Sequence, residues 1–404
     1  MFYLHMAVRS LKRCGQRSLL CMLICLVTVL FLHLYAGNVR DLEQMREHLP
    51  DAIKVAGKIC NLDGSMDQEL KIEEALVTEL LASESVAEPA VTVQLLADLD
   101  ASGSKRRGSI PPFEARGVNC LAGAGGLKPE DVTLTEGNTL DFLASGERKC
   151  LVDRALLEQK GYQTGDRILL DLYYYRYGDY HEVFCEPLEQ CEYEIAGVMD
   201  AGSGAGYPEL ILPIQAVQDS YRRAGYPFLA DSFFFTVKNP LRLNAFKEEM
   251  QKLGLLPVSG AAEMHYEGNA LVVQDETFIK AAERIEESLT LLRGFLPLIF
   301  CIAAGAGYLT AHLFIQDRRP EYALLRSIGI GKMKSCLVFF TEYLLLAVAG
   351  SGLGTLCAWP VMSENHSFSL MVMWVSVGFC VLGMLAALVS MSKHSVMQIL
   401  SQKD

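Results

Sequence analysis

The chain has 404 residues, 51% of them hydrophobic, with a formal net charge of −12 and a mean hydropathy of +0.22. This combination excludes an ordinary soluble protein, because a soluble fold of this charge would be less apolar. Nucleic-acid binding is not indicated either, since the basic triplet Lys105-Arg106-Arg107 is short and isolated within an acidic segment.

Four apolar runs are long enough to cross a bilayer as helices, which takes about 20 residues each. They lie at 18–36, 294–315, 336–359 and 370–391. The segment 37–293 between the first two is long enough for a folded domain with its own core. The remaining parts are a basic tail at 1–17, loops at 316–335 and 360–369, and a tail at 392–404.

The distribution of charge predicts the orientation in the membrane. The two tails and the 316–335 loop together hold 11 Lys or Arg and 3 acidic residues, whereas the segment Asn38–Arg293 holds 25 basic and 43 acidic residues. Basic residues remain on the cytoplasmic side of a membrane. Both termini and the 316–335 loop are therefore expected in the cytoplasm, and the acidic segment outside, at a cell membrane.

The first apolar run has two interpretations. It follows a basic region and ends at Leu34-Tyr35-Ala36, a weak match to a signal-peptide cleavage site. A retained helix is favoured, because the run is long and a helical pattern continues beyond it. Val39, Leu42, Met45 and Leu49 recur every three or four residues until Pro50.

The segment 37–293 has the pattern of a mixed α+β domain. Strands are expected at Val55–Cys60, Ala90–Leu96, Ala115–Leu121, Glu192–Met199, Leu210–Ile214 and Ser232–Val237. Helices are expected at Ile72–Ala82 and Pro240–Leu253, and Cys150–Leu172 reads as strand, short helix, turn and strand. The amphipathic stretch Thr277–Leu292 continues into the second apolar run and should pair with Val39–Leu49 as a two-helix stalk.

The cysteines predict little chemistry. Seven of the 12 lie in or beside the apolar runs, where they behave as small apolar residues. Of the five outside, Cys185 and Cys191 flank a short stretch and are candidates for a disulfide that staples a hairpin. A metal site there is the weaker alternative, because no His-Cys cluster completes it. No metal and no cofactor are expected.

Small residues recur at a spacing of four in the apolar runs, as Ala303/Gly307, Gly350/Gly354 and Gly383/Ala387, which permits close helix packing. Glu342 is the one ionisable residue well inside such a run. Buried charges in membranes are functional or paired, so we expect Glu342 to pair with a basic group or to reach interfacial water.

The loop Asp317–Ser335 contains a short predicted helix. Pro320 suits its first position, Glu321 and Arg326 suit its two ends, and Gly329 can terminate it in a left-handed conformation. Leu324 and Ile328 fall four apart on one face, with Leu325 beside them. Either another protein covers this apolar ridge, or the loop serves only to set the membrane topology.

This loop resembles a known family. Arg319, Glu321, Ala323, Leu324, Arg326 and Gly329 are similar to the R-x-E-x-A-[LI]-x-R-x-x-G signature of MacB/FtsX-type ABC transporter permeases. Pro320 and Ile330-Gly331 depart from the usual pattern. The resemblance implies that this segment is a coupling helix docked on a separate ABC ATPase. It also implies a second permease copy or paralogue, and a four-helix permease with a MacB-like outer domain.

No catalytic set is recognisable. Gly329–Lys332 lacks the upstream glycine and the following Ser or Thr of a phosphate-binding loop, and no G-x-S-x-G motif occurs. We therefore expect a chain without enzymatic activity of its own. The resemblance implies a permease subunit that couples ATP hydrolysis in a partner to movement of its outer domain. The output would be export or extraction of a lipid, peptide or drug, or regulation of an envelope process. The alternative is a membrane-anchored extracytoplasmic sensor or assembly protein with no ATPase.

Overall fold

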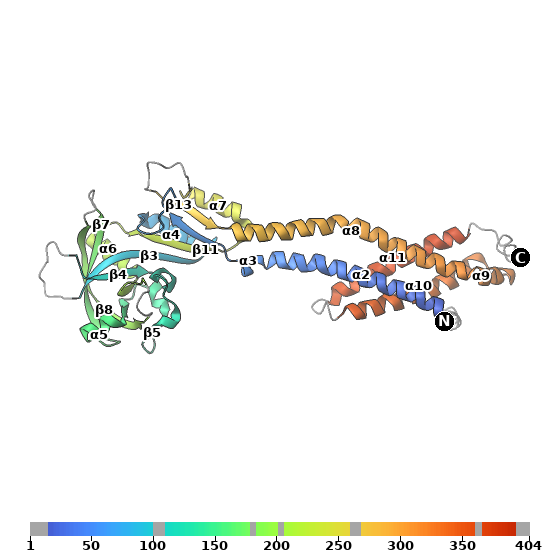
Figure 1. Cartoon of the computed structure of the whole chain (residues 1–404), viewed down its shortest axis with the longest axis horizontal. Helices are drawn as coiled ribbons and strands as arrows, with labels where there is room; N and C mark the ends of the chain where they lie inside the picture. The colour runs from blue at the N-terminus through green and yellow to red at the C-terminus, as the bar shows by residue number, and fades with distance from the viewer. Residues whose placement is uncertain are drawn as a thin grey trace. The chain divides into compact units, whose positions relative to one another are not determined.

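The computed structural model describes residues 15–99, 110–177, 183–200, 206–258, 268–359 and 366–392 (Figure 1). The chain divides into two compact units. The membrane unit combines Met1–Leu49 with Ala281–Asp404, and the outer unit is Pro50–Lys280. The basic triplet at 105–107, most of the two tails and most of the 360–369 loop lie outside the described residues.

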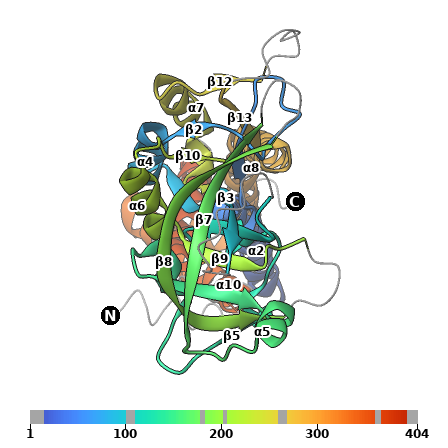
Figure 2. The same ribbon diagram turned by 90° about the vertical axis from the view of Figure 1, so that its left-hand side faces the viewer.

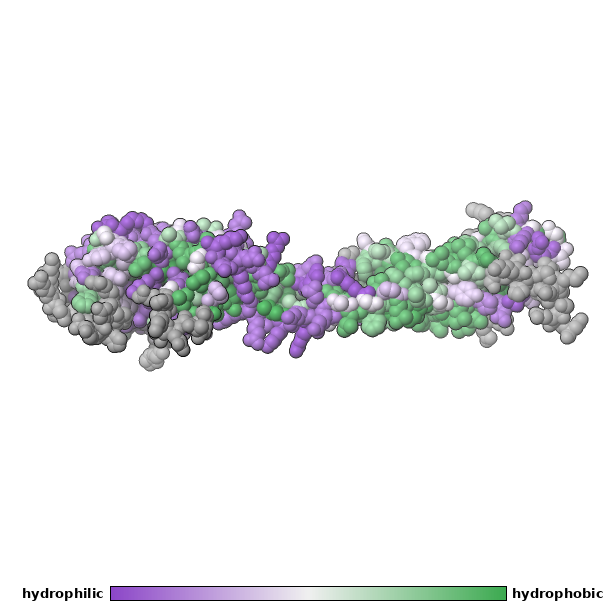
Figure 3. Space-filling view, turned by 90° about the horizontal axis from the view of Figure 1, so that it is seen from above, coloured by the Kyte–Doolittle hydropathy of each residue, from purple (hydrophilic) through white to green (hydrophobic). Residues whose placement is uncertain are grey.

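Four long helices build the membrane unit, and each is long and apolar enough to cross a membrane. They are α2 (Gly15–Glu47), α8 (Glu276–Asp317), α10 (Lys332–Ala358) and α11 (His366–Ser392). Each contains most or all of one predicted apolar run. Figure 3 shows a largely hydrophobic surface over this bundle, as expected for residues that face lipid. The chain is a membrane protein with four candidate spans among its described residues.

The helices approach most closely at glycines. A Cβ placed on Gly350 or Gly354 of α10 would lie 2.6 Å or 2.9 Å from the carbonyl oxygens of Met22 and Leu26 on α2. Gly307 of α8 lies equally close to the backbone of α11, against Gly383. The predicted close packing at small residues is therefore confirmed at these two crossings.

The extensions of α2 and α8 toward the outer unit contact each other within the membrane unit. Arg293 forms a 2.7 Å ion pair with Glu43, and the Tyr35 hydroxyl donates to the carbonyl oxygen of Leu292. Ile285 and Leu289 are buried on the predicted apolar face of α8. The helix α2 ends at Glu47, before Pro50, and a short α3 (Leu49–Ala52) follows. The role of these parts of α2 and α8 as a stalk remains a prediction.

The outer unit is built on a large mixed sheet of eleven strands among the described residues. Its strands are β1 (Ala56–Cys60), β3 (Val86–Asp98), β4 (Phe113–Val118), β5 (Val132–Leu134), β6 (Lys149–Asp153), β7 (Arg167–Tyr177), β8 (Val183–Met199), β9 (Leu210–Pro213), β11 (Ser232–Val237), β12 (Leu256–Pro257) and β13 (Ala270–Gln274). A small second sheet pairs β2 (Ile72–Glu73) with β10 (Leu229–Ala230). The helices of this unit are α4 (Glu74–Ala82), α5 (Arg154–Lys160), α6 (Ile214–Ala224) and α7 (Leu243–Lys252).

Part of the large sheet closes on itself. Each neighbouring pair in the series β3, β4, β9, β6, β8, β7 is hydrogen-bonded, and β7 pairs back onto β3. Figure 2 shows the long strands β7 and β8 curving around this ring. The residues Leu151, Ala196, Met199 and Ile211 belong to one buried cluster. Each of these six strands thereby has a neighbour on both sides, whereas β12 and β5 remain at the ends of the sheet.

The long strand β3 belongs to both parts of the sheet. Along one edge its first half pairs with β11 as far as Thr92, whereas from Leu96 onward the same edge pairs with β7. Between these points the carboxylate of Asp231 accepts the backbone N–H of Gln94 at 2.5 Å. Residues 93–95 of β3 therefore have no neighbouring strand on this edge. We call this interruption the gap in the pairing of β3, and the side chain of Asp231 fills part of it.

Most predicted elements of the outer unit are present. The prediction for Cys150–Leu172 is confirmed by β6, α5 and β7, with Gly161 and Gly165 at positive φ. The helix predicted at Ile72–Ala82 is wrong in its first two residues, which form β2 against β10. The prediction of a strand at Glu192–Met199 is too short, because β8 already begins at Val183.

The proposed disulfide between Cys185 and Cys191 is wrong. Both residues lie on the single strand β8, and both thiols are free. Six residues of extended chain separate their Cα atoms by about 20 Å, whereas a disulfide needs Cα atoms within about 7 Å. The two cysteines therefore staple no hairpin; β8 pairs with β7 through its backbone instead.

The glycine crossing between α10 and α2 generates a prediction with an internal control. Replacing Gly350 or Gly354 by Ala should lower the stability of the full chain by about 1–3 kcal/mol, because overpacking forces α2 away. Gly352→Ala on the same helix should be tolerated, since nothing lies within 4 Å of its added Cβ. Thermal unfolding in detergent measures all three. An equal loss for Gly352→Ala would contradict the packing described here.

Candidate functional site

The segment between α8 and α10 forms the predicted short helix, α9 (Arg319–Ser327). Pro320 occupies its first turn together with Glu321, and Arg326 lies in its last turn. Gly329 follows with φ +89°, a left-handed conformation that suits glycine. The backbone N–H of Ile330 donates to the carbonyl oxygen of Leu325 and closes the end of the helix. The predicted helix and its terminating glycine are thereby confirmed.

A buried ion pair anchors this helix. The guanidinium of Arg318, immediately before α9, binds both carboxylate oxygens of Glu342 on α10, at 2.9 Å and 3.2 Å. The Arg318 side chain is 6% exposed and that of Glu342 is 1% exposed. The geometry is bidentate, the arrangement in which arginine and carboxylate match best. Glu342 therefore has the basic partner that its place in an apolar run required.

Arg318 makes further contacts that join neighbouring elements. Its Nη1 also lies 3.0 Å from the carboxylate of Glu321 on α9. Its guanidinium carbon lies 5.3 Å from the ring centroid of Phe314 on α8, within cation–π range. One side chain thus links the end of α8, the first turn of α9 and Glu342 of α10.

One face of α9 is packed into the membrane unit. Tyr322 and Ala323 are buried, and the Tyr322 ring lies 6.3 Å from that of Phe339 on α10. Leu325 packs against the same cluster. Our grouping of Leu325 with the exposed ridge is therefore wrong: the helix turns this leucine toward its own chain.

The opposite face of α9 carries the exposed part of the predicted ridge. Leu324 is 61% exposed and Ile328 is 69% exposed, one helical turn apart. Met333, at the start of α10, is 85% exposed. Exposed aliphatic side chains are ordinary where a helix faces lipid, but here they alternate with Glu321, Arg326 and two lysines. We define the exposed ridge as Leu324 and Ile328.

The two arginines of the sequence motif differ in their surroundings. Arg326 folds over the end of α9 and donates from Nη1 to the carbonyl oxygen of Ile330 at 3.1 Å. Arg319 is half-exposed at the start of the helix. Among the described residues no group of three His, Cys, Asp or Glu side chains could hold a metal ion.

The sequence alone did not distinguish Arg318 from the four other basic residues of the loop. Glu342 signalled that a partner was needed, because an unpaired carboxylate is costly in an apolar run. The partner's identity depends on the turn between α8 and α9, which places Arg318 and not Arg319 on the inner side. Only the three-dimensional arrangement supplies that information.

Breaking the ion pair should cost more than removing it. Arg318→Met alone and Glu342→Leu alone each leave a buried charge without its partner and should destabilise the chain by roughly 3–5 kcal/mol. The double variant removes both charges and should recover most of that loss. Thermal unfolding of the four proteins measures the coupling. Additive losses in the double variant would show that the two side chains do not depend on each other.

Part of the chain is similar to known proteins. Residues 294–403 match the model of the FtsX-like permease C-terminal domain. No curated protein matches the chain. Among solved structures, a domain of a candidate permease protein from Porphyromonas gingivalis is 15% identical, covers 55% of this chain and 89% of its own, and superposes with a TM-score of 0.30. The resemblance read from the α9 motif is confirmed: residues 294–403, which include that motif, match the C-terminal domain of FtsX-like permeases.

Proposed function

We propose that this chain is the permease subunit of an ABC transporter and that the exposed ridge of α9 docks on a separate ATPase subunit. The main support for this proposal is that Leu324 and Ile328 are exposed on a helix whose other face packs on the membrane unit. A rigid helix with an apolar face is a common way to fill a groove on a partner. The family match over residues 294–403 supports the same function.

The contacts of Arg318 explain how such docking would be transmitted. A force on α9 reaches α8 and α10 through one buried side chain, without an intervening flexible loop. The helix α8 runs unbroken for 42 residues, roughly 60 Å, from Glu276 to Asp317. It begins within the outer unit, since the division between the units falls after Lys280. Movement at α9 would therefore displace a helix that continues into the outer unit.

The proposed arrangement places α9 and both termini in the cytoplasm and the outer unit on the other side of a cell membrane. The basic loop and the acidic segment support this orientation. Two permease chains, identical or paralogous, would act with the ATPase. ATP hydrolysis would occur in that partner, and the output would be export or extraction of a lipid, peptide or drug, or control of an envelope process.

The docking ridge can be tested without disturbing the fold. Leu324→Asp combined with Ile328→Asp should abolish co-purification of the ATPase, because hot-spot residues in an interface contribute about 2 kcal/mol or more each. The variant should still reach the membrane and retain its thermal stability, since both side chains are exposed. The measurements are a pull-down from membranes that contain both subunits and a parallel check of expression.

Two further variants serve as controls. Leu241→Asp makes the same change at an exposed leucine of the outer unit and should leave ATPase recovery unchanged. Leu325→Asp should instead lower stability, because this side chain packs on the core of the membrane unit. Normal ATPase recovery with the Leu324/Ile328 double variant would refute the docking role and favour the sensor or assembly protein without an ATPase.

A further inference from the structure

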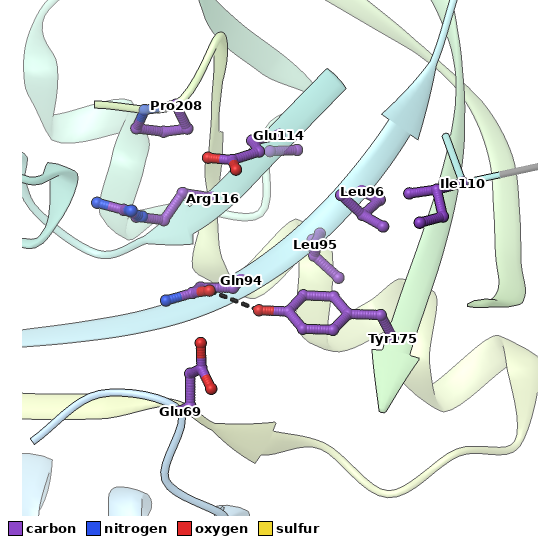
Figure 4. Close-up of a pocket in the computed structure, with 10 residues that line it drawn as sticks. Glu69, Gln94, Leu95, Leu96, Ile110, Glu114, Arg116, Tyr175 and Pro208 are labelled. Atoms are coloured by element: carbon purple, nitrogen blue, oxygen red, sulfur yellow. Dashed lines mark hydrogen bonds between the residues drawn. The ribbon is translucent and has the colours of Figure 1, made fainter. Parts of the chain in front are cut away.

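The gap in the pairing of β3 opens into a cavity of about 240 Å³ in the outer unit (Figure 4). Its walls come from β3, β4 and β7, with Glu69, Ile110 and Pro208 from neighbouring loops. The cavity lies where β3 exchanges β11 for β7 as its neighbour. Its volume is slightly below the roughly 300–1,000 Å³ typical of ligand pockets, which suits a small molecule.

The cavity is lined by a cation, Arg116, that makes no direct ion pair with a described residue. Arg116 on β4 has a buried Nε with no hydrogen-bond partner, and its guanidinium forms no ion pair within the described part of the chain. Burial lowers the pKa of Arg116 from its usual value, although Glu114, Tyr175 and Asp231 oppose that shift. A buried N–H of a guanidinium is costly unless an acceptor meets it. An acceptor supplied from outside would remove this cost.

A second donor lies beside Arg116. Gln94 is its direct cross-strand partner in the β3–β4 register, so both side chains lie on one face of the sheet. The Tyr175 hydroxyl donates to the Gln94 side-chain oxygen at 2.5 Å. Figure 4 shows that this bond turns the amide nitrogen of Gln94 away from Tyr175 and toward the side of Arg116. The two residues thus offer a paired donor set for one oxyanion.

Acidic side chains complete the lining. Glu69 and Glu114 line the cavity on either side of Gln94, and Figure 4 shows the Glu69 carboxylate directed toward Gln94. Glu69 adopts φ +56°, an unfavourable conformation for a residue other than glycine. Burial raises the pKa of the adjacent Asp231 to about 7, and the charge of Glu69 adds to this effect. The carboxylates of Glu69 and Glu114 would repel a ligand with only negative charge next to Arg116.

We propose that this cavity binds a small zwitterion, an amino acid or the end of a short peptide, with its carboxylate on Arg116 and Gln94 and its ammonium group near Glu69 and Glu114. Leu96, Ile110 and Pro208 supply an apolar wall for a side chain. The site belongs to the outer unit and does not depend on α9 or on an ATPase. Its failure would leave the coupling proposal untouched.

Calorimetric titration of the purified full-length chain tests the proposal. The probes are L-leucine, L-alanyl-L-leucine, 4-methylpentanoate and 3-methylbutylamine. 4-Methylpentanoate is leucine without its ammonium group, and 3-methylbutylamine is leucine without its carboxylate. At least one zwitterion should bind at least about tenfold more tightly than either single-charge probe. The comparison of leucine with the dipeptide identifies which source the site prefers. No binding by either zwitterion, or equal binding of 4-methylpentanoate, would overturn the proposal.

Substitutions separate a ligand site from a structural arginine. Arg116→Gln should weaken zwitterion binding about tenfold or more, whereas Arg154→Gln, at an exposed ion pair with Asp200, should have no effect. Glu69→Gln with Glu114→Gln should weaken leucine binding but strengthen that of 4-methylpentanoate. Without ligand, Arg116→Gln should keep or raise the thermal midpoint, because it removes a half-buried charge that forms no ion pair with a described residue. A lower midpoint would show that Arg116 supports the fold instead.

Discussion

One buried ion pair joins α9 to the rest of the membrane unit. Arg318 and Glu342 lie in an apolar bundle, where a charge without its partner is strongly destabilising. Their bidentate contact fixes the turn between α8 and α9, and that turn decides which face of α9 is buried. Tyr322, Ala323 and Leu325 consequently face the core, and Leu324 and Ile328 are left exposed. The position of the proposed docking ridge follows from this pair.

In the outer unit, the strand β3 is shared by the open part and the closed part of the large sheet. The strand β3 has to leave β11 and join β7, and the change of neighbour leaves backbone groups at residues 93–95 without a strand on that edge. Asp231 meets one of them, and the cavity with Arg116 occupies the remaining space. A binding site at such a junction needs no special loop, because the topology of the sheet itself leaves room for a ligand.

Much of this organisation was predictable from sequence, because its causes are local. Apolar runs predict spans, small residues at a spacing of four predict close crossings, and Pro320 and Gly329 delimit α9. The errors concern contacts between distant segments. Cys185 and Cys191 were candidates for a disulfide because they flank the short stretch Glu186–Gln190, which could have been the turn of a hairpin. Their strand is defined by pairing with β7, which no local pattern reveals.

Pairings across the chain were beyond the sequence for the same reason. Nothing near Arg318 distinguishes it from Arg319, and nothing near Arg116 indicates that Gln94 lies beside it on another strand. The orientation of Leu325 depended on the turn before α9, so its assignment to the exposed ridge failed. Patterns with a period of two or four predict which element forms, whereas the packing between elements decides which side chain becomes available to a partner.

The central claim is that the outward face of α9 contacts an ATPase while its inward face belongs to the permease. Site-specific photo-cross-linking tests this directly in membranes that contain both subunits. A photoreactive residue at position 328 should form an adduct with the ATPase, whereas one at position 325 should cross-link only within the permease chain. Adducts with the ATPase from position 325 alone, or from neither position while the ATPase still co-purifies, would contradict the account.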